Sequence, residues 1–335
     1  KDSIGIDLGT RHCALAYQKL NASAPSPTIL PIRQFIKLDA AGESQVLPSY
    51  IYLPPLSRSD AADEQDQQTQ DPAQEVSPSL PPRVVGEAAR GQASLTPDRV
   101  IHSVKSWLCH PHIDRKSRIL PWPGNEIEDG RRLSPVEASA EYLSYLKQIW
   151  NESVAQGAYD EQFERQIIII TVPASFDSTA QALTLEAAKS AGYPDKLQLL
   201  EEPQAAFYHY LSGSQQDAAT REKLKTKSEY KILVCDIGGG TTDFSLFQVR
   251  QEDKDETPHI KRLRVSDHLL LGGDNMDLAL AYLAESNLEG ASAKIQDPYN
   301  WQKLSDQCRI LKEKVLATSG SPDEKFYISL SGRGS

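Results

Sequence analysis

The sequence predicts an α/β fold built from two similar lobes. One observation is the continuous apolar run QIIIITVP, which ends at Pro173 and precedes a helical segment capped by Asp177 and ending near Gly192. Such a run is typical of a strand buried on both faces, and strand–helix–strand order indicates an α/β sheet. The other observation is a repeat: GIDLGT and CDIGGGTTD each follow an apolar strand with an aspartate, a glycine turn and a threonine. Two such hairpins, one in each half, indicate duplicated lobes that face each other.

Composition narrows the function classes. The chain has 335 residues, of which 39% are hydrophobic and 24% charged, as expected for a soluble protein of two domains. Its net charge of −10 disfavours broad contact with nucleic acid or anionic membrane, and no apolar run is long enough for a membrane span. The four cysteines are widely separated, which favours a reducing compartment, the cytoplasm. Cys109, His110 and His112 lack a second ligand cluster, so we expect no metal there.

The N-terminal elements follow in order. Residues 4–17 predict a strand, a turn and a strand, and a second strand pair is expected around 29–38 and 49–53. Residues 57–82 are acidic, glutamine-rich and studded with proline, with almost nothing to bury. This composition predicts a solvated insertion loop, and the alternative is a loop that docks a partner.

Helices are predicted next. A helical stretch at 98–108 carries Lys105, and a clear helix starts at Ser134, where SPVE supplies an N-cap, a proline and a glutamate at the third position. Apolar residues at helical spacing then form a core-facing stripe: Tyr142, Leu143, Leu146, Ile149 and Trp150. This stripe requires no functional explanation.

The two glycine turns carry the predicted chemistry. Glycine permits positive φ and a close backbone approach, so successive N–H groups can point at phosphate oxygens. Asp7 and Asp236 end the preceding strands, where they would face a hydrated Mg²⁺ from both sides. A single glycine turn could be a simple tight turn, but the matching pair favours phosphate binding.

The motifs resemble a known family. GIDLGT, TVPASF, EEPQAA, DIGGGTTDFS and LGGDNMD occur in the order seen in the ATPase domain of the heat-shock 70-kDa (DnaK-like) chaperones. The resemblance covers nearly the whole chain apart from the insertion. It implies an actin-like, two-lobed ATPase fold with ribonuclease-H-like duplicated lobes, and ATP or ADP with Mg²⁺ in the cleft.

The resemblance also implies domain boundaries. Lobe I is expected over 1–225, with an outer subdomain at roughly 38–134, and lobe II over 226–335. Lobe II would have an inner part at 226–271 and an outer part at 272–335. We expect the second lobe to be incomplete at its C-terminal end, because a complete domain of this family continues with a further adenosine-binding loop.

Family roles transfer to residues that match the motifs. Asp7 and Asp236 match the aspartates that hold Mg²⁺ through water, and the resemblance implies that Asp236 also takes part in catalysis. Glu202 and Asp243 match residues that position metal and attacking water. Lys105 occupies the place of the lysine that steadies the γ-phosphate. Phosphoryl transfer requires mainly alignment and charge neutralisation, which suits this set.

Nucleotide contacts are implied at the turns and on a C-terminal helix. In the helix expected from about residue 300 to 317, Leu304, Cys308, Leu311 and Val315 form an apolar stripe, with Arg309 on the other faces. The resemblance implies that Thr241 is also catalytic and that Lys312 lies near adenine and ribose. The full set of implied contacts to phosphate or nucleoside is Gly9, Thr10, Arg11, Gly238, Gly239, Gly240, Thr241, Thr242, Gly272, Gly273 and Lys312.

The chain departs from the family pattern in three places. Arg11 stands where the family has a second threonine, and it either adds a phosphate contact or points into solvent. Gln181 replaces an arginine that relays nucleotide state between domains, which puts coupling of the usual kind in doubt. Glu201 and Gln204 replace the usual flanks of the conserved glutamate and proline.

Three functions are consistent with these residues. The first is an ATP-hydrolysing chaperone motor, whose client polypeptides and co-chaperones bind through regions outside this chain. The second, favoured by Arg11 and Gln181, is a non-cycling nucleotide-binding regulator or co-chaperone. The third is a sugar or metabolite kinase, which the EEP and LGGDNMD motifs disfavour.

Overall fold

The computed structural model describes most of the chain. The described residues are 1–21, 27–55, 80–110, 112–122, 127, 130–214, 229–250, 259–267, 269–287, 295, 297–317, 325 and 327–328. Most of the predicted insertion loop at 57–82 lies outside them. Among the described residues, none of the helices combines the length and apolar character that crossing a membrane requires.

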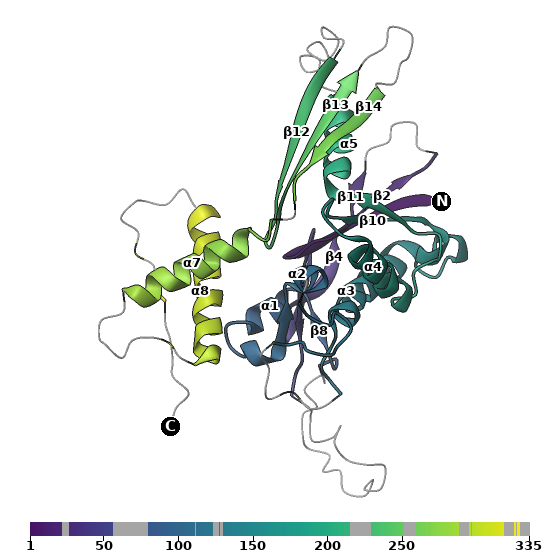
Figure 1. Cartoon of the computed structure of the whole chain (residues 1–335). Coiled ribbons are helices and arrows are strands. Elements are labelled where there is room, and N and C mark those ends of the chain that lie inside the picture. The colour runs from purple at the N-terminus through teal and green to yellow at the C-terminus, as the bar shows by residue number, and fades with distance from the viewer. Residues whose placement is uncertain are drawn as a thin grey trace, which may run out of the picture.

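The structure is mixed α/β, as predicted, and its strands form several separate sheets (Figure 1). The largest sheet has the strand order β11-β10-β1-β2-β3, and β6 pairs with β2. β10 runs parallel to both β1 and β11, whereas β1 and β2 form an antiparallel hairpin. Its strands are β1 (Asp2–Leu8), β2 (His12–Lys19), β3 (Thr28–Ile29), β6 (Leu47–Pro48), β10 (Ile167–Val172) and β11 (Gln198–Glu201).

The apolar run QIIIITVP forms the strand β10, inside this sheet. Ile168 and Ile170 are buried with Ile4 and Ile6 of β1 in the main hydrophobic core. On the opposite face Ile169 is only half-buried. The prediction of a strand inside the sheet is confirmed, but only one of its faces is fully covered.

Helices α3 (Pro135–Trp150) and α4 (Ser178–Ser190) pack against this core. Ser134 and Glu137 form the predicted capping box, because each side chain accepts a hydrogen bond from the other residue's backbone N–H. Asp177 caps α4 by accepting from the N–H of Ala180 at 2.6 Å. Both predicted helix starts are confirmed.

The predicted second strand pair is wrong in its pairing. The strands concerned are β4 (Ile32–Lys37), β5 (Ala40–Ser44), β7 (Tyr50–Tyr52), β8 (Val84–Val85) and β9 (Val100–His102). β4 turns back to pair with β5, and β7 pairs with β8 and β9 instead. Apolar pattern predicts where a strand forms but does not specify its partner, which tertiary packing decides.

The predicted helix at 98–108 is divided into three elements. Pro97–Arg99 is a 3-10 turn, Val100–His102 is β9, and α2 covers Val104–Cys109. Ser103, with φ of 54°, interrupts the backbone between strand and helix. Lys105 is still helical, in the first turn of α2. A short helix α1 (Glu87–Gln92) precedes this region.

The second half contains an antiparallel three-stranded sheet in the order β12-β13-β14. β12 (Glu229–Ile237) and β13 (Thr242–Arg250) flank the second glycine turn, and β14 (His259–Val265) lies beside β13. Helix α5 (Glu202–Ser214) follows β11 directly and covers this sheet (Figure 1), where Phe207 stacks on Phe247 with ring centroids 4.8 Å apart.

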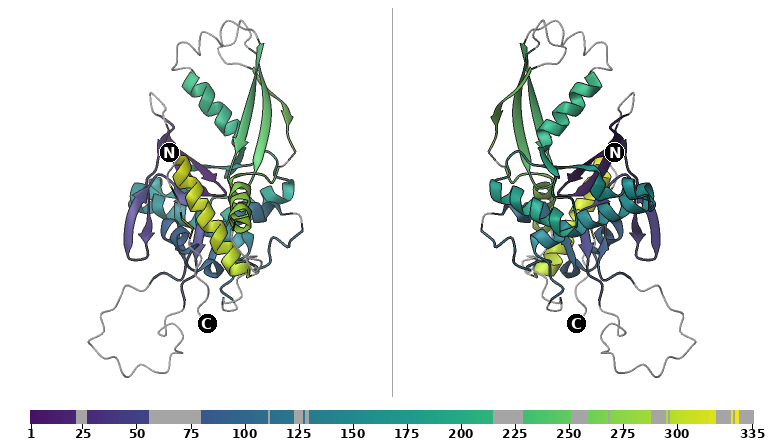
Figure 2. Two further views of the ribbon diagram at one scale, coloured as in Figure 1. Left: turned by 90° about the vertical axis from the view of Figure 1, so that its left-hand side faces the viewer. Right: turned by 90° about the vertical axis from the view of Figure 1, so that its right-hand side faces the viewer.

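Two helices, α7 (Gly273–Ser286) and α8 (Pro298–Ala317), cross each other (Figures 1 and 2), and α8 pairs with α1 through Glu313 and Arg90 at 3.3 Å. The residues buried between α7 and α8 are Ala281, Leu304 and Cys308. Leu304 and Cys308 confirm part of the predicted stripe of α8, whereas Val315 is 42% exposed. Arg309, predicted on the polar faces, is only 2% exposed, because α8 packs against the N-terminal part of the chain through this side.

Candidate functional site

The two predicted glycine turns are in direct contact. A Cβ atom placed on Gly239 would meet the stem of Arg11 at under 3.0 Å, and one on Gly240 would lie 3.3 Å from Cγ2 of Thr10. The β1–β2 turn and the β12–β13 turn therefore lie side by side, although they are separated by more than half of the chain.

Close approach explains the glycines of these turns. A Cβ on Gly9 would clash with the carbonyl oxygen of His12, and one on Gly272 would lie 2.6 Å from the carbonyl oxygen of Gly238. The part of our expectation that concerned positive φ is wrong. Among the described residues, the glycines with positive φ are Gly86, Gly130, Gly157 and Gly192. At Gly9 and Gly272 neighbouring backbone leaves no room for a side chain, whereas at Gly239 and Gly240 the crowding atoms are the side chains of Arg11, Ser106 and Thr10.

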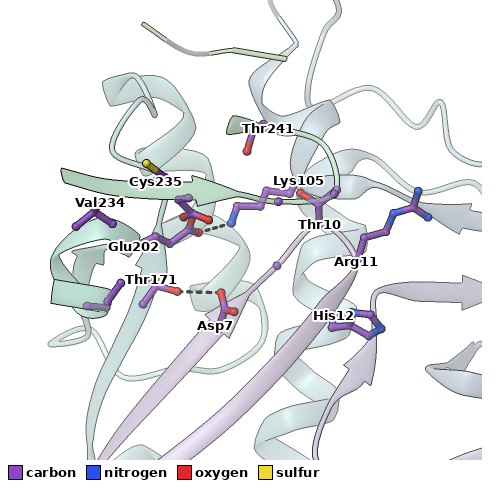
Figure 3. Close-up of a pocket in the computed structure, with 16 residues that line it drawn as sticks. Asp7, Thr10, Arg11, His12, Lys105, Thr171, Glu202, Val234, Cys235 and Thr241 are labelled. Atoms are coloured by element: carbon purple, nitrogen blue, oxygen red, sulfur yellow. Dashed lines mark hydrogen bonds and ion pairs between the residues drawn. The ribbon is translucent and has the colours of Figure 1, made fainter. Parts of the chain in front are cut away.

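A pocket of about 500 Å³ opens between the two turns (Figure 3). It is bordered by both glycine turns, the start of α2, the start of α5 and the ends of β1, β10 and β12. The lining residues that the sequence singled out are Asp7, Gly9, Thr10, Arg11, Lys105, Glu202, Asp236, Gly238, Gly239 and Thr241. Segments from five separate parts of the chain thus meet at one cavity.

Other predicted positions support the second turn without lining the pocket. They are Gly240, Thr242, Asp243, Gly272, Gly273 and Lys312. The Thr242 hydroxyl donates to the Leu271 carbonyl at 2.6 Å, and the Lys312 ammonium donates to the Gly273 carbonyl at 2.9 Å. Asp243 is 3% exposed and pairs with Asp236 in the β12–β13 register. The roles assigned to this group remain predictions.

Lys105 and Glu202 form an ion pair on the pocket wall (Figure 3). Their side chains are 10% and 16% exposed. Burial is the largest influence on Glu202 and, with Asp7 and Asp236, raises its pKa to about 7, although Lys105 opposes the shift. Burial acts to lower the pKa of Lys105, but the surrounding carboxylates outweigh it and the net pKa is raised. The lysine therefore stays charged.

Negative charge exceeds positive charge at this wall. Asp7, Asp236 and Glu202 all line the pocket, and Lys105 is the cation paired among them. The Thr171 hydroxyl donates to the Asp7 carboxylate at 3.1 Å and fixes its orientation (Figure 3). In the described part of the chain, no three histidine, cysteine or acidic side chains are close enough to hold a metal directly. The donor set fits a hydrated divalent cation held through its waters.

Arg11 does not behave as either sequence alternative predicts. Its stem lines the pocket, but its guanidinium turns away from Lys105 and Glu202 (Figure 3). It donates to the Tyr50 hydroxyl at 2.7 Å and to the Asp277 carboxylate at 2.7 Å. The charge is thus neither in solvent nor offered to a phosphate, since it is engaged in contacts that tie the first turn to α7.

Several residues of the site were not singled out from the sequence. Thr171 and Asp277 lie inside the quoted motifs TVPASF and LGGDNMD, so the motifs themselves carried the available signal. Tyr50 lies in β7, and nothing in its sequence context indicates its contact with Arg11. Gln181 donates to the Phe176 carbonyl at 3.2 Å, a local contact at the start of α4.

The CHPH segment has a packing role. His110 stacks on Trp107 with ring centroids 5.9 Å apart, and the Cys109 thiol donates to the Lys105 carbonyl at 3.2 Å. Burial raises the pKa of Cys109 to about 12, so the thiol stays protonated. These contacts stabilise α2, which carries Lys105.

His102 belongs to a polar chain beside the pocket. Its Nδ1 lies 3.0 Å from the Ser103 hydroxyl, which donates to Asp274 at 3.1 Å, and its Nε2 lies 3.2 Å from the side-chain amide of Gln302. The ring also stacks on Tyr50 at 5.6 Å. Both partners fit a neutral imidazole that donates from Nδ1 and accepts at Nε2.

This environment predicts acid sensitivity. Burial, with the charges of Arg11 and Arg309, lowers the pKa of His102 to about 3, against about 6.5 in an unfolded chain. Between these values only the unfolded chain binds the proton, so the free energy of unfolding falls as pH falls from about 6.5 towards 3. Per pH unit, we expect the free energy of unfolding of His102→Gln to fall by about 1 kcal/mol less than that of the unmodified chain, within the limit of ~1.4 kcal/mol for one proton bound only by the unfolded state.

Urea denaturation between about pH 6.5 and 4.5 measures this difference. His112→Gln, at an exposed position, is the control and should follow the unmodified chain. Identical pH profiles for His102→Gln and the unmodified chain would contradict the assignment.

The fold and the pocket define the class of protein. Two glycine turns, two aspartates and a lysine–glutamate ion pair surround one polar cavity in an α/β domain. Comparison with known families then identifies it more narrowly. The chain belongs to the Hsp70 family, because the family profile described as Hsp70 protein matches residues 72–329.

Curated relatives agree with this assignment. The chaperone protein HscA homolog of Pseudoalteromonas atlantica is 31% identical over 265 residues, covering 74% of this chain and 38% of the relative. The chaperone protein HscA homolog of Burkholderia multivorans is 31% identical over 260 residues, covering 74% of this chain and 36% of the relative. This chain therefore spans less than two fifths of the length of either relative.

Proposed function

We propose that this chain is the nucleotide-binding domain of an Hsp70-like chaperone, which binds ATP and ADP with Mg²⁺ and hydrolyses ATP. The observation that carries the proposal is the Lys105–Glu202 ion pair on the wall of a pocket bordered by two glycine turns. The proposal includes an actin-like arrangement of two lobes around that pocket. It is supported by family membership and by the chaperone names of the relatives.

Each residue has a role that its position allows. The backbone N–H groups of the two turns, with Thr10 and Thr241, bind phosphate oxygens at the junction of the hairpins. Lys105 supplies the charge that stabilises negative charge developing on the transferred phosphoryl group. Glu202 orients the lysine and the attacking water. Little covalent chemistry is required of the protein, because hydrolysis depends on alignment of water and phosphate.

Asp7 and Asp236 would hold Mg²⁺ through its water shell. When bound, the ion would supply positive charge that neutralises part of the charge on the phosphates. The excess of carboxylates at the wall supports this assignment. Thr171 keeps the carboxylate of Asp7 oriented towards the pocket through its hydrogen bond.

Client polypeptides and co-chaperones are part of the same proposal. They would bind through regions outside this chain, and the support is that both relatives are named chaperones. A cytoplasmic location also belongs to the proposal and rests on the composition of the sequence.

Calorimetric titration with ATP and ADP, with and without Mg²⁺, tests nucleotide binding. Binding that requires Mg²⁺ supports the proposal, and no binding under either condition overturns it. We expect Asp236→Ala to weaken Mg²⁺–ADP binding by about tenfold or more, a loss of at least ~1.4 kcal/mol. Asp160→Ala, an exposed aspartate far from the pocket in sequence, is the matched control and should bind like the unmodified chain.

A non-cycling regulator is the second candidate. Arg11 favours this candidate in two ways. It replaces the second threonine of the family pattern, so the first turn lacks that hydroxyl, and its guanidinium is engaged with Tyr50 and α7. Phosphate release from radiolabelled ATP under single-turnover conditions separates the two candidates. Magnesium-dependent release indicates a motor, whereas tight binding without release over many hours indicates the regulator.

A further inference from the structure

We propose that an ionic clasp centred on Arg11 holds the nucleotide pocket closed and limits the rate at which nucleotide leaves. The clasp consists of seven side chains from the first turn, β7, α7 and α8: Arg11, Tyr50, Asp274, Asp277, Asp306, Arg309 and Lys312. The inference concerns the regulation of the proposed nucleotide site and rests on that proposed function for its kinetic part.

Arg11 joins the first turn to α7. Its guanidinium pairs with Asp277 at 2.7 Å and with Asp274, both in the first half of α7. Its other terminal nitrogen donates to the Tyr50 hydroxyl. A guanidinium that donates from both terminal nitrogens to different partners specifies geometry as well as charge, which a lysine cannot fully reproduce.

α8 joins the same cluster from the other side. Arg309 donates to the Tyr50 hydroxyl and pairs with Asp306 at 3.1 Å. Lys312 pairs with Asp277 at 2.6 Å. The hydroxyl of Tyr50 thus accepts from a guanidinium of the first turn and from one of α8, and the carboxylate of Asp277 bridges a cation from each.

The cluster is buried only because these elements are together. The side chains of Asp277 and Arg309 are each 3% exposed, and that of Arg11 is 19% exposed. Charges desolvated in this way gain little net stability even when paired, since separation returns them to water. An interface held by such pairs can therefore open more readily than an apolar one.

One side of the clasp borders a cavity. Arg309 and Asp306 line a volume of about 170 Å³ between α7, α8 and His102. The ion pairs favour the closed state, but because the net gain of buried pairs is small they do not lock it.

The clasp is connected directly to the pocket. The N–H groups of Gly273 and Asp274, at the start of α7, donate to the carbonyls of Gly238 and Gly239 at 3.1 and 2.7 Å. The stem of Arg11 lies against Gly239 and lines the pocket. A movement of α7 would therefore displace the second turn, and release of Arg11 would free the two turns from each other.

Arg11→Gln, Asp277→Asn and the double variant test the clasp, with Arg118→Gln as the matched control. Arg118 forms an exposed pair with Glu137, remote from the pocket lining. We expect both single variants to release a fluorescent ADP–Mg²⁺ complex at least about fivefold faster, a typical coupling effect. The effect of the double variant should be smaller than the two single effects combined, because both changes break the Arg11–Asp277 contact. Arg118→Gln should match the unmodified chain.

Hydrogen exchange on the nucleotide-free chain provides an independent readout. We expect faster exchange at α7 and β7 in Arg11→Gln and Asp277→Asn, and Arg11→Lys should restore part of the protection. If the unmodified chain binds no ADP, the proposed function fails while this readout still decides the clasp. Unchanged exchange at α7 in both variants overturns the clasp, as does unchanged release. If Arg11→Gln fails to fold, Arg11→Lys and Asp277→Asn carry the comparison.

Discussion

Lys105→Ala is expected to abolish most ATP turnover while leaving nucleotide bound. Lys105 is the cation paired with Glu202 on the pocket wall, among carboxylates that cannot stabilise developing negative charge. Removing one electrostatic donor from a transition state typically lowers the rate on the order of 10² to 10³-fold. Nucleotide affinity should change far less, because the N–H groups of both turns remain in place.

Single-turnover phosphate release measures the rate, and calorimetry measures the affinity for ADP. Lys116→Ala is the matched control, since Lys116 forms an exposed pair with Glu186. Equal single-turnover rates for Lys105→Ala and the unmodified chain would contradict the catalytic role assigned to Lys105. A parallel loss of ADP affinity would show instead that Lys105 holds the nucleotide in its ground state.

Gly9→Ala is expected to damage both the fold and the pocket. A Cβ at this position would lie well under 3.0 Å from the carbonyl oxygen of His12, which is backbone and cannot rotate away. The first turn must therefore shift, at a cost of about 1–3 kcal/mol in the free energy of unfolding, as for other overpacked sites. The same shift moves the phosphate-facing N–H groups, so we expect Mg²⁺–ADP affinity to fall by about tenfold or more, ~1.4 kcal/mol.

Gly91→Ala is the matched control for this substitution. Gly91 lies in α1, and a Cβ there would meet nothing within 4 Å. Alanine in a helix is favoured over glycine by about 1 kcal/mol, so this variant should be neutral or more stable. Thermal unfolding and ADP titration of both variants provide the comparison. If Gly9→Ala unfolds and binds like Gly91→Ala, steric crowding does not explain the glycine at this turn.

These two predictions separate the parts of the site. Gly9 acts on the shape of the turn, and Lys105 acts on charge at the phosphoryl group. If the chain binds nucleotide without hydrolysing it, Gly9→Ala would still weaken ADP binding. Lys105→Ala would then have no measurable effect on turnover, because the unmodified chain would show none. The pair of variants therefore tests the motor against the non-cycling regulator as well as each residue.

Much of the local structure follows from the sequence because its causes are local. Ser134 and Asp177 cap their helices through contacts within three residues, and the apolar run before Pro173 forms a strand inside the sheet. The pocket residues of the two turns could also be predicted, because each turn carries its aspartate and threonine beside it in the sequence. Their repetition indicated that both belong to one site.

The pairing of strands and the burial of charged side chains could not be predicted in this way. The strands at 29–38 and 49–53 were recognisable, but their partners depend on which apolar faces meet. Arg309 has the helical position of a solvent-facing residue and is nevertheless buried, since α8 packs against β7 through Tyr50. Local periodicity contains no information about such a contact.

The α/β class, the two glycine turns with Asp7 and Asp236, and the resemblance to the Hsp70 family could all be read from the sequence alone. Each depends on residues adjacent in the chain, where propensity, capping and turn geometry act. The contacts of Arg11 could be found only in the folded chain. Its guanidinium donates at once to partners that lie 39 and 266 positions away in the sequence, and only tertiary packing brings these three side chains together and desolvates them.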